Sequence, residues 1–400
     1  MSRKLEVIQA LTKLSKNIPK SKEISIDNVV FKLHYKWTVF FLLVSTTLII
    51  LQEYFGNNIE CIADIGVSIK VINTFCFSKT TFSVTKHYNK LDVQNKVVPH
   101  PGIGPYTEED TIIHHAYYQW VPFFLFLQSV MFYIPHYTWK HMEGGRLRAL
   151  LVDLKYTPLS GEEDIKVNNQ CIPSKKKKIA RLQIIENHFL ERLHINRTWA
   201  VGLVFCEILN AINLSLQIFI LNLFLGGNFI NLGIRVINSD FSKESDPLEF
   251  VFPKVTKCTF HKYGPSGSIQ NHDALCVMSL NVVNETIYTF LWFWLLFLVL
   301  ATAAGLLWRF LVFVLYSRSQ RFNAIIFRNT CPKSLQPWNL SQVIDECHFS
   351  DWLFLRYISK NLDDNSFREI FHRLSARIAE NSVPERIQFN NGEFRPLNSE

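Results

Sequence analysis

The sequence predicts an all-α membrane protein that crosses the bilayer four times, and its composition and hydropathy pattern are the observations that predict this. Of its 400 residues, 48% are hydrophobic and 14% aromatic, while only 19% are charged. That balance favours a membrane protein over a soluble enzyme. A helix needs roughly 20 apolar residues to cross about 30 Å of hydrocarbon. Four runs in this chain are long and apolar enough to do so.

The four runs define the predicted transmembrane helices. They are residues 37–53, 117–139, 199–225 and 286–316. The first is the shortest and needs Tyr35 and Tyr54 as interfacial ends. The second opens with AYYQWVPF, whose Tyr and Trp rings suit the headgroup level of a bilayer. Any single run could instead be a buried helix of a soluble protein, but four in one chain make that alternative remote.

The distribution of Lys and Arg predicts which segments face the cytoplasm. Residues 1–36 hold eight basic and three acidic side chains, and residues 140–198 hold twelve and seven. The loops 54–116 and 226–285 each hold five basic and six acidic side chains. The positive-inside rule therefore places the N-terminal segment 1–36, the loop 140–198 and the C-terminal segment 317–400 in the cytoplasm. The other two loops lie outside.

Cysteine placement agrees with this topology. Cys61 and Cys76 fall in the first outside loop, and Cys258 and Cys276 fall in the second. An even set of cysteines in an oxidising compartment predicts disulfides, whereas reduced thiols are expected on the cytosolic side. Spacings of fifteen and eighteen residues match no compact zinc motif. The sequence by itself leaves three pairings of these four cysteines open.

Several sequence blocks, taken in order, carry a family resemblance. They are YYQW (Tyr117, Tyr118, Gln119 and Trp120), EGGRLRALL at 143–151, FPKVTKCTFHKYGPSGSIQNHDALC at 252–276, and the paired cysteines of the two loops. Together they resemble the innexins, the invertebrate gap-junction family. The resemblance covers about residues 27–354. The variants IDNVVFKLHYKWT, VINTFCF and LLWR look most like the insect innexin seven subgroup.

The resemblance implies an architecture and a function. It implies an octameric ring, a hemichannel, that docks with one on the adjacent cell and passes ions and small molecules at plasma-membrane gap junctions. It implies that the first outside cysteine pairs with the fourth and the second with the third, hence Cys61 with Cys276 and Cys76 with Cys258. It also implies that the N-terminal segment folds into the pore mouth, although residues 1–25 are longer and more basic than the short start common in the family.

The implied partners are further copies of the chain or other innexins, the opposing hemichannel and membrane lipid. No cofactor is expected. Nucleic acid is not expected either, because the basic run 175–178 is best explained as a solvated or lipid-facing loop. Two alternatives remain beside the gap-junction channel. One is a non-junctional hemichannel that releases small solutes such as ATP, and the other is a four-span receptor or adhesion protein. No Walker loop, G-x-S-x-G or H-E-x-x-H motif is present, so neither an enzyme nor a metal site is predicted.

Polar residues within and beside the runs give further expectations. Glu207, Asn210 and Asn213 mark a polar face of the third run, which serves either hydrogen bonding between helices or exposure to a pore. Arg309, near the end of the fourth run, is expected to extend to the cytoplasmic interface. Asn284-Glu285-Thr286 is a glycosylation sequon close to the predicted bilayer surface. Residues 340–358 and 366–379 are expected to form helices of a cytoplasmic domain.

Overall fold

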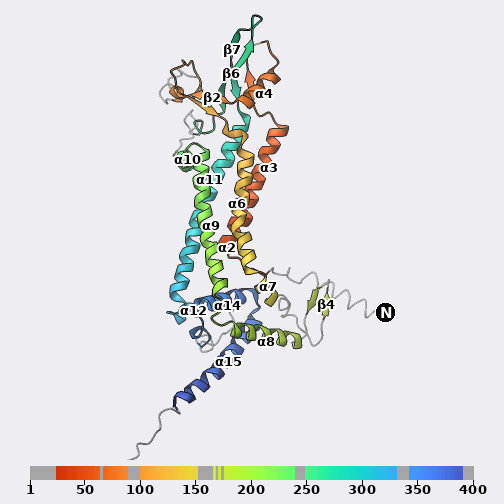
Figure 1. The fold of residues 1–400 in the computed structure, drawn as a ribbon, viewed down its shortest axis with the longest axis vertical. Coiled ribbons are helices and arrows are strands. Elements are labelled where there is room, and N and C mark those ends of the chain that lie inside the picture. The colour runs from red at the N-terminus through yellow and green to blue at the C-terminus, as the bar shows by residue number, and fades with distance from the viewer. Residues whose placement is uncertain are drawn as a thin grey trace, which may run out of the picture. The chain divides into compact units, whose positions relative to one another are not determined.

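The computed structural model describes residues 24–63, 66–88, 100–151, 165–167, 170–172, 175–238, 248–330 and 342–390. Over these residues the chain is mostly helical (Figure 1). Residues 1–23, most of the N-terminal segment that the resemblance places at the pore mouth, lie outside the described part. The helices are α2 (Val29–Lys32), α3 (Val39–Phe55), α4 (Ile69–Lys79), α6 (Val121–Glu143), α7 (Arg146–Leu151), α8 (Lys175–Glu191), α9 (Arg197–Phe224), α10 (Phe229–Ile237), α11 (Ser279–Leu315), α12 (Gln320–Thr330), α14 (Phe349–Asn361) and α15 (Asp364–Asn390).

The chain divides into two compact units, which we describe separately. Unit 1 comprises Met1–Val29, Tyr137–Ile208 and Ala304–Glu400. Unit 2 comprises Val30–His136 and Leu209–Ala303. Unit 2 holds the core to which α3, α6, α9 and α11 contribute, and it also holds the loops that follow α3 and α9.

Three helices among the described residues are long and apolar enough to cross a membrane. They are Val29–Phe55, which includes α2, a π-helical stretch (Leu33–Thr38) and α3, together with α9 and α11. They correspond to the predicted runs 37–53, 199–225 and 286–316, but the first begins eight residues earlier. Its polar first turns are stabilised by contacts that hydropathy does not detect. His34 contacts the Thr302 hydroxyl at 2.9 Å, and Trp294 Nε1 donates to the Thr38 hydroxyl at 2.9 Å.

The second predicted run, residues 117–139, forms a 3-10 turn (Tyr117–Gln119) followed by α6. At 23 residues α6 is long enough to cross hydrocarbon. It is not among the three most apolar helices because Gln128, two prolines and several tyrosines and histidines dilute its apolar side chains. The fourth span therefore stays a prediction.

The prediction of an all-α fold is wrong for the two loops, which together form a five-stranded antiparallel sheet. Its strands run in the order β1-β7-β6-β2-β3. The first loop supplies β1 (Glu60–Ile62), β2 (Thr81–Val84) and β3 (Ile112–His115), and the second supplies β6 (Val255–Tyr263) and β7 (Ile269–Val277). A separate two-stranded sheet joins β4 (Ile165–Val167) to β5 (Gln170–Ile172).

Local sequence explains the longest pair of strands. VTKCTFHKY in β6 is rich in β-branched and aromatic residues, which fit a pleated, half-buried surface. It pairs with β7 in register from Val255 opposite Val277 to Tyr263 opposite Ile269. The connecting turn places Gly267 at φ 81°, a left-handed conformation that glycine adopts without a steric penalty.

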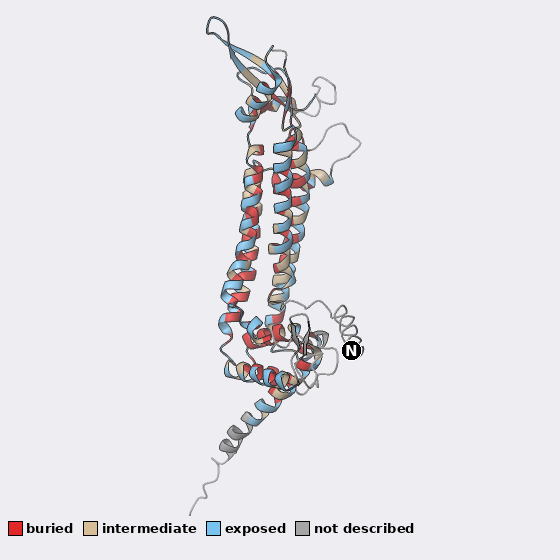
Figure 2. Cartoon of the chain, turned by 90° about the vertical axis from the view of Figure 1, so that its right-hand side faces the viewer, coloured by how far each residue is buried: buried red, intermediate tan, exposed pale blue. Residues whose placement is uncertain are grey.

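Burial is one-sided along the long helices of unit 2. The core contains leucines from each of them, including Leu42, Leu125, Leu221 and Leu291. Large apolar side chains also lie exposed on the opposite faces, among them Phe40, Phe123, Phe219 and Phe297, and Figure 2 shows such exposed positions along the helices. Water would make so extensive an apolar surface unfavourable, whereas hydrocarbon accommodates it.

In unit 1, helices α12, α14 and α15 pack around buried aromatic rings. Phe327 lies 5.7 Å from Trp352 and 5.6 Å from Phe371, measured between ring centroids. The helix predicted over residues 340–358 is interrupted at 346–348, so that α14 begins only at Phe349. The helix predicted over residues 366–379 lies within α15.

Candidate functional site: the disulfide-linked sheet

The two loops are joined by two disulfides. Cys61 in β1 lies opposite Cys276 in β7 and is bonded to it, and Cys76 in α4 is bonded to Cys258 in β6. These are the partners that the family resemblance implies. All four cysteines are buried. We call the five strands β1, β2, β3, β6 and β7 together with α4 the disulfide-linked sheet; all of it lies within unit 2.

Helix α4 is held against the sheet by more than its disulfide. Ile72 and Cys76 are four residues apart and therefore share one helical face, and both are buried. The side-chain oxygen of Asn73 accepts a hydrogen bond of 2.9 Å from the backbone N–H of Cys61. The rings of Phe75 and Phe260 meet edge to face at 4.9 Å. The sequence does not indicate this role of Asn73, because nothing in its neighbourhood reveals a partner in β1.

Two residues of the YYQW motif donate hydrogen bonds to the last turn of α4. The Tyr118 hydroxyl donates to the Phe77 carbonyl at 3.1 Å, and the Gln119 side-chain amide donates to the same oxygen. That carbonyl lies in the last turn of α4, where helix carbonyls lack an intrahelical partner. Tyr117 packs edge to face on Phe252 at 6.0 Å, while Trp120 remains exposed. Tyr118 and Gln119 thus connect the segment before α6 to the disulfide-linked sheet, and Tyr117 packs on the segment that leads into β6.

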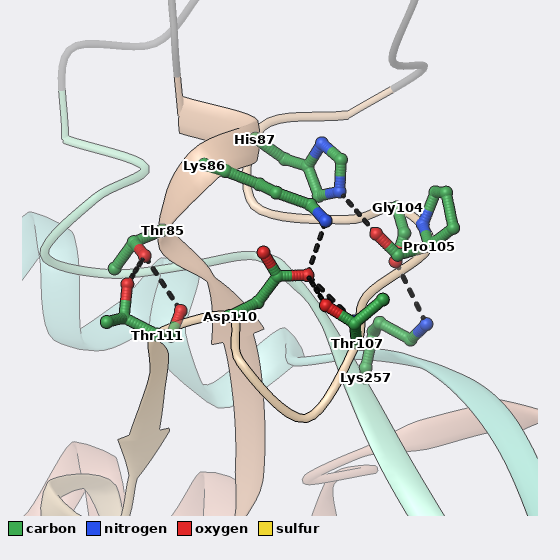
Figure 3. Close-up of polar contacts among 9 residues, drawn as sticks. All are labelled: Thr85, Lys86, His87, Gly104, Pro105, Thr107, Asp110, Thr111 and Lys257. Carbon is green, nitrogen blue, oxygen red and sulfur yellow. Dashed lines mark hydrogen bonds and ion pairs between the residues drawn. The ribbon is translucent and has the colours of Figure 1, made fainter.

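Hydrogen bonds hold the described parts of the loop between β2 and β3, residues 85–88 and 100–111 (Figure 3). The Asp110 carboxylate accepts hydrogen bonds from the Thr107 N–H at 2.7 Å and the Thr107 hydroxyl at 3.1 Å, and it pairs with Lys86. These donors, the Lys86 ammonium first, lower the pKa of Asp110. The Thr85 hydroxyl donates to the Thr111 carbonyl at 2.7 Å. Both ends of this loop are therefore closed by polar contacts.

Lys257 of β6 fixes the middle of the same loop. Its Nζ donates to the Gly104 carbonyl at 3.1 Å, lies 3.1 Å from Asp273 and sits 4.9 Å from the centre of the Tyr106 ring. Only 7% of Lys257 is exposed. His87 contacts the Pro105 carbonyl at 2.9 Å (Figure 3). The two loops of the chain are therefore joined by a buried cation as well as by disulfides.

The last residue of β3, His115, is a buried histidine. His115 is 4% exposed, and its Nε2 contacts the Ser83 hydroxyl, which also accepts a hydrogen bond of 3.0 Å from Tyr88. Burial, followed by the charge of neighbouring His114, lowers the pKa of His115 to about 4. His115 is therefore neutral at physiological pH, and its protonation would disfavour the folded sheet.

The polar residues of the predicted runs lie inside the chain. Arg309 does not extend to an interface as expected; its side chain is 14% exposed and forms an ion pair with the buried Glu207 at 2.6 Å. In unit 2 the Gln128 amide donates to Gln217 at 3.1 Å, and Asn213, four residues from Gln217, is buried beside it. Asn210 is buried as well. This arrangement favours hydrogen bonding between helices over exposure to a pore.

The sequon asparagine is not accessible. Asn284 lies in the second turn of α11 and is fully buried, with its amide directed at the Asn281 side chain. A glycan needs an exposed amide nitrogen. The structure therefore argues against glycosylation of Asn284, which the sequon alone left open.

Comparison with known proteins identifies the family. The innexin family model matches residues 27–378. The chain is 46% identical to innexin inx7 of Drosophila melanogaster over 88% of this chain and 80% of that protein. It is 36% identical to innexin inx2 of Schistocerca americana (91% and 96% covered) and 34% identical to innexin shaking-B of Drosophila melanogaster (92% and 94% covered). This chain belongs to the innexin family, whose members are subunits of gap-junction channels.

Proposed function

We propose that this innexin crosses the plasma membrane four times, assembles into an octameric ring and docks with a ring on the adjacent cell. The docked pair passes ions and small molecules between the two cells. The observation that carries this proposal is the disulfide-linked sheet, in which segments about 200 residues apart in sequence form one cross-linked surface. A docking surface must keep its shape in water without support from lipid, and cross-links reduce the entropy that its loops could regain by disordering.

The sheet also supports α6 as the fourth span. Both loops contribute strands to one sheet and must lie on the same side of the membrane. Helix α9 ends at the second loop, so its first residue, Arg197, lies on the opposite side. The chain must therefore cross once between residues 116 and 197. Within the described part of that segment α6 is the longest helix, and at about 1.5 Å per residue its 23 residues extend about 35 Å.

Charge distribution supports the orientation. The N-terminal segment, the 140–198 loop and the C-terminal segment lie on one side in this topology, and the first two carry the excess of basic residues. The positive-inside rule assigns that side to the cytoplasm. The disulfide-linked sheet then faces the extracellular space, where disulfides persist.

The β6–β7 hairpin offers an exposed surface for docking. Tyr263 and Ile269, which flank its turn, are 75% and 65% exposed. Backbone pairing across nine positions holds the two strands together, and the strand residues next to the turn are exposed. Docking between rings would bury these two side chains.

Dual voltage clamp on paired cells that express only this chain tests the proposal. We expect junctional current from the wild type and none from the Cys61→Ser, Cys276→Ser variant. The matched control is Cys347→Ser, which removes a buried thiol outside the disulfides and should keep the current. Surface labelling must show that all three proteins reach the plasma membrane.

The outcome separates the alternatives. Current across single membranes together with ATP release, but no junctional current, would indicate an unpaired hemichannel. Cell adhesion without any conductance would indicate a receptor or adhesion protein. If the wild type gives junctional current only when a second innexin is supplied, the ring is heteromeric.

A further inference from the structure

We propose that His194, His348 and Asp351 form a binding site for a divalent transition-metal ion, with Zn²⁺ as the best match. All three residues belong to unit 1 and lie apart from the disulfide-linked sheet. One ligand atom from each lies within 4.8 Å of the others. This site is independent of the function proposed above.

The two histidine rings face each other through the same ring atom. Nδ1 of His194 is in direct contact with Nδ1 of His348, and the rings meet edge to face with centroids 4.2 Å apart. Nδ1 of His194 also lies 3.7 Å from a carboxylate oxygen of Asp351. Two facing imidazole nitrogens repel unless a proton or a cation lies between them. The adjacent carboxylate would balance the charge of a cation.

This donor set suits zinc. Two imidazole nitrogens and one carboxylate oxygen occur together in three-ligand zinc sites, in which water takes the fourth position. Bonds of about 2.0–2.2 Å in a tetrahedron place ligand atoms about 3.3 Å apart. The spacing of His194 and Asp351 is already close to this. The rings of His194 and His348 need only to separate slightly, and because both residues are exposed, their side chains can rotate at little cost.

Hydrogen bonds hold the Asp351 carboxylate in position for metal binding. It is fully buried, and one carboxylate oxygen accepts a 3.0 Å hydrogen bond from the Asn196 amide while the other accepts a 3.1 Å bond from the backbone N–H of His194. Each oxygen keeps a further lone pair for a metal ion. Asp351 lies in the first turn of α14, so its position does not depend on a flexible loop.

The backbone of His194 adopts a strained conformation. Its φ is 71°, a left-handed conformation that is unfavourable for a residue with a side chain. The hydrogen bond from its N–H to Asp351 helps to hold this conformation. His348, at the N-cap of α14, makes no capping hydrogen bond with its side chain. Strain of this kind is concentrated at functional sites.

A cavity gives a metal ion access. Both histidines line a cavity of about 740 Å³ between α9, the end of α11 and the start of α14, and Arg197 lies in the same lining. Three protein ligands and a nearby guanidinium favour reversible binding over a permanent structural site. Occupancy would hold the turn that precedes α9 against the start of α14.

Metal titration of the full-length protein tests this proposal. The protein is purified with an affinity tag free of histidine, placed in lipid nanodiscs and titrated with Zn²⁺ by calorimetry and with Co²⁺ by visible absorption. We expect one saturable site per subunit and the intense absorption of four-coordinate Co²⁺. In His348→Ala the affinity of this site should fall at least tenfold. His372→Ala, which removes an exposed histidine elsewhere in unit 1, should leave it unchanged.

A second variant separates lost ligation from lost folding. His194→Gly removes a ligand and at the same time relieves the left-handed strain, so its thermal stability should be retained while its affinity falls at least tenfold. Absence of a saturable site in the wild type would overturn the proposal. It would equally be overturned if His194→Gly or His348→Ala bound Zn²⁺ as tightly as the wild type.

Discussion

Glu207 of α9 and Arg309 of α11 form a two-point ion pair inside unit 1. Arg309 Nε donates to one carboxylate oxygen at 2.8 Å and Nη2 donates to the other at 2.6 Å. Asn28 donates to the same carboxylate at 2.6 Å. A guanidinium and a carboxylate that meet in this way match in geometry as well as in charge.

The pair predicts an asymmetry between single and double substitutions. Glu207→Leu or Arg309→Met alone leaves an unpaired buried charge and should destabilise the protein by about 3–5 kcal/mol. The double variant removes both charges, and it should unfold close to the wild-type Tm. Thermal unfolding in detergent, followed by fluorescence-detected size exclusion, measures all three. If the double variant is as unstable as the single variants, the ion pair stabilises the fold beyond neutralising its own two charges.

Gly233 permits the close approach of α10 to α11. A Cβ at this position would lie 2.1 Å from the ring of Trp292, whose Nε1 donates to the Ile230 carbonyl at 3.1 Å. Gly233→Ala should therefore cost about 1–3 kcal/mol through overpacking, and Tm should fall. Gly202→Ala is the control because its nearest neighbour is the flexible Met142 methyl group at 3.0 Å. If the two variants have the same Tm, the contact with Trp292 is not rigid.

The stability of the disulfide-linked sheet should depend on pH through His115. Its folded pKa of about 4 lies below the ordinary value of 6.5, so the unfolded state binds a proton first as the pH falls. Stability is therefore complete above pH 6.5 and is lost progressively down to about pH 4, by at most about 3 kcal/mol.

Hydrogen exchange of the β2 and β3 amides across this pH range measures the effect, after correction for intrinsic exchange. Protection should fall with pH in the wild type and much less in His115→Gln, which cannot be protonated. His261→Gln, an exposed position on β6, should behave as the wild type does. An unchanged slope in His115→Gln would assign the pH dependence to another group.

Lys257 should govern the order of the loop over residues 100–111. Lys257→Met keeps the apolar stem but removes the contacts with Gly104 and Asp273, so we expect faster hydrogen exchange across this loop. Junctional current should fall while the protein still reaches the cell surface. Lys262→Met, an exposed lysine on the same strand, serves as the control. Equal exchange in both variants would contradict an anchoring role for Lys257.

The long helices could be predicted from the sequence, since an apolar run of about 20 residues has few other stable solutions. Their first turns could not. The polar residue His34 precedes the predicted first run, and in the helix it contacts Thr302, which lies 268 positions away. Hydropathy detects the solvent that a segment prefers and not its hydrogen-bond partners.

The sheet and the histidine pair were missed for a related reason. Strands β1, β2 and β3 are three or four residues long, too short to show an alternating pattern, and two of them pair with residues of the other loop. His194 and His348 are 154 positions apart, so no compact metal motif includes them. The cysteine pairing was available only through the family resemblance, because spacing alone allows three arrangements.

The distance in sequence between bonded cysteines has a consequence for biosynthesis. Cys61 and Cys276 are separated by 215 residues. At about 5–20 residues per second, the ribosome needs on the order of 10–40 s to deliver the second thiol after the first. In the proposed topology, Cys61 and Cys76 share the lumen of the secretory pathway during that interval without their final partners. A nascent subunit therefore requires protection from a premature Cys61–Cys76 bond, or an isomerase that reverses it, before the second loop arrives.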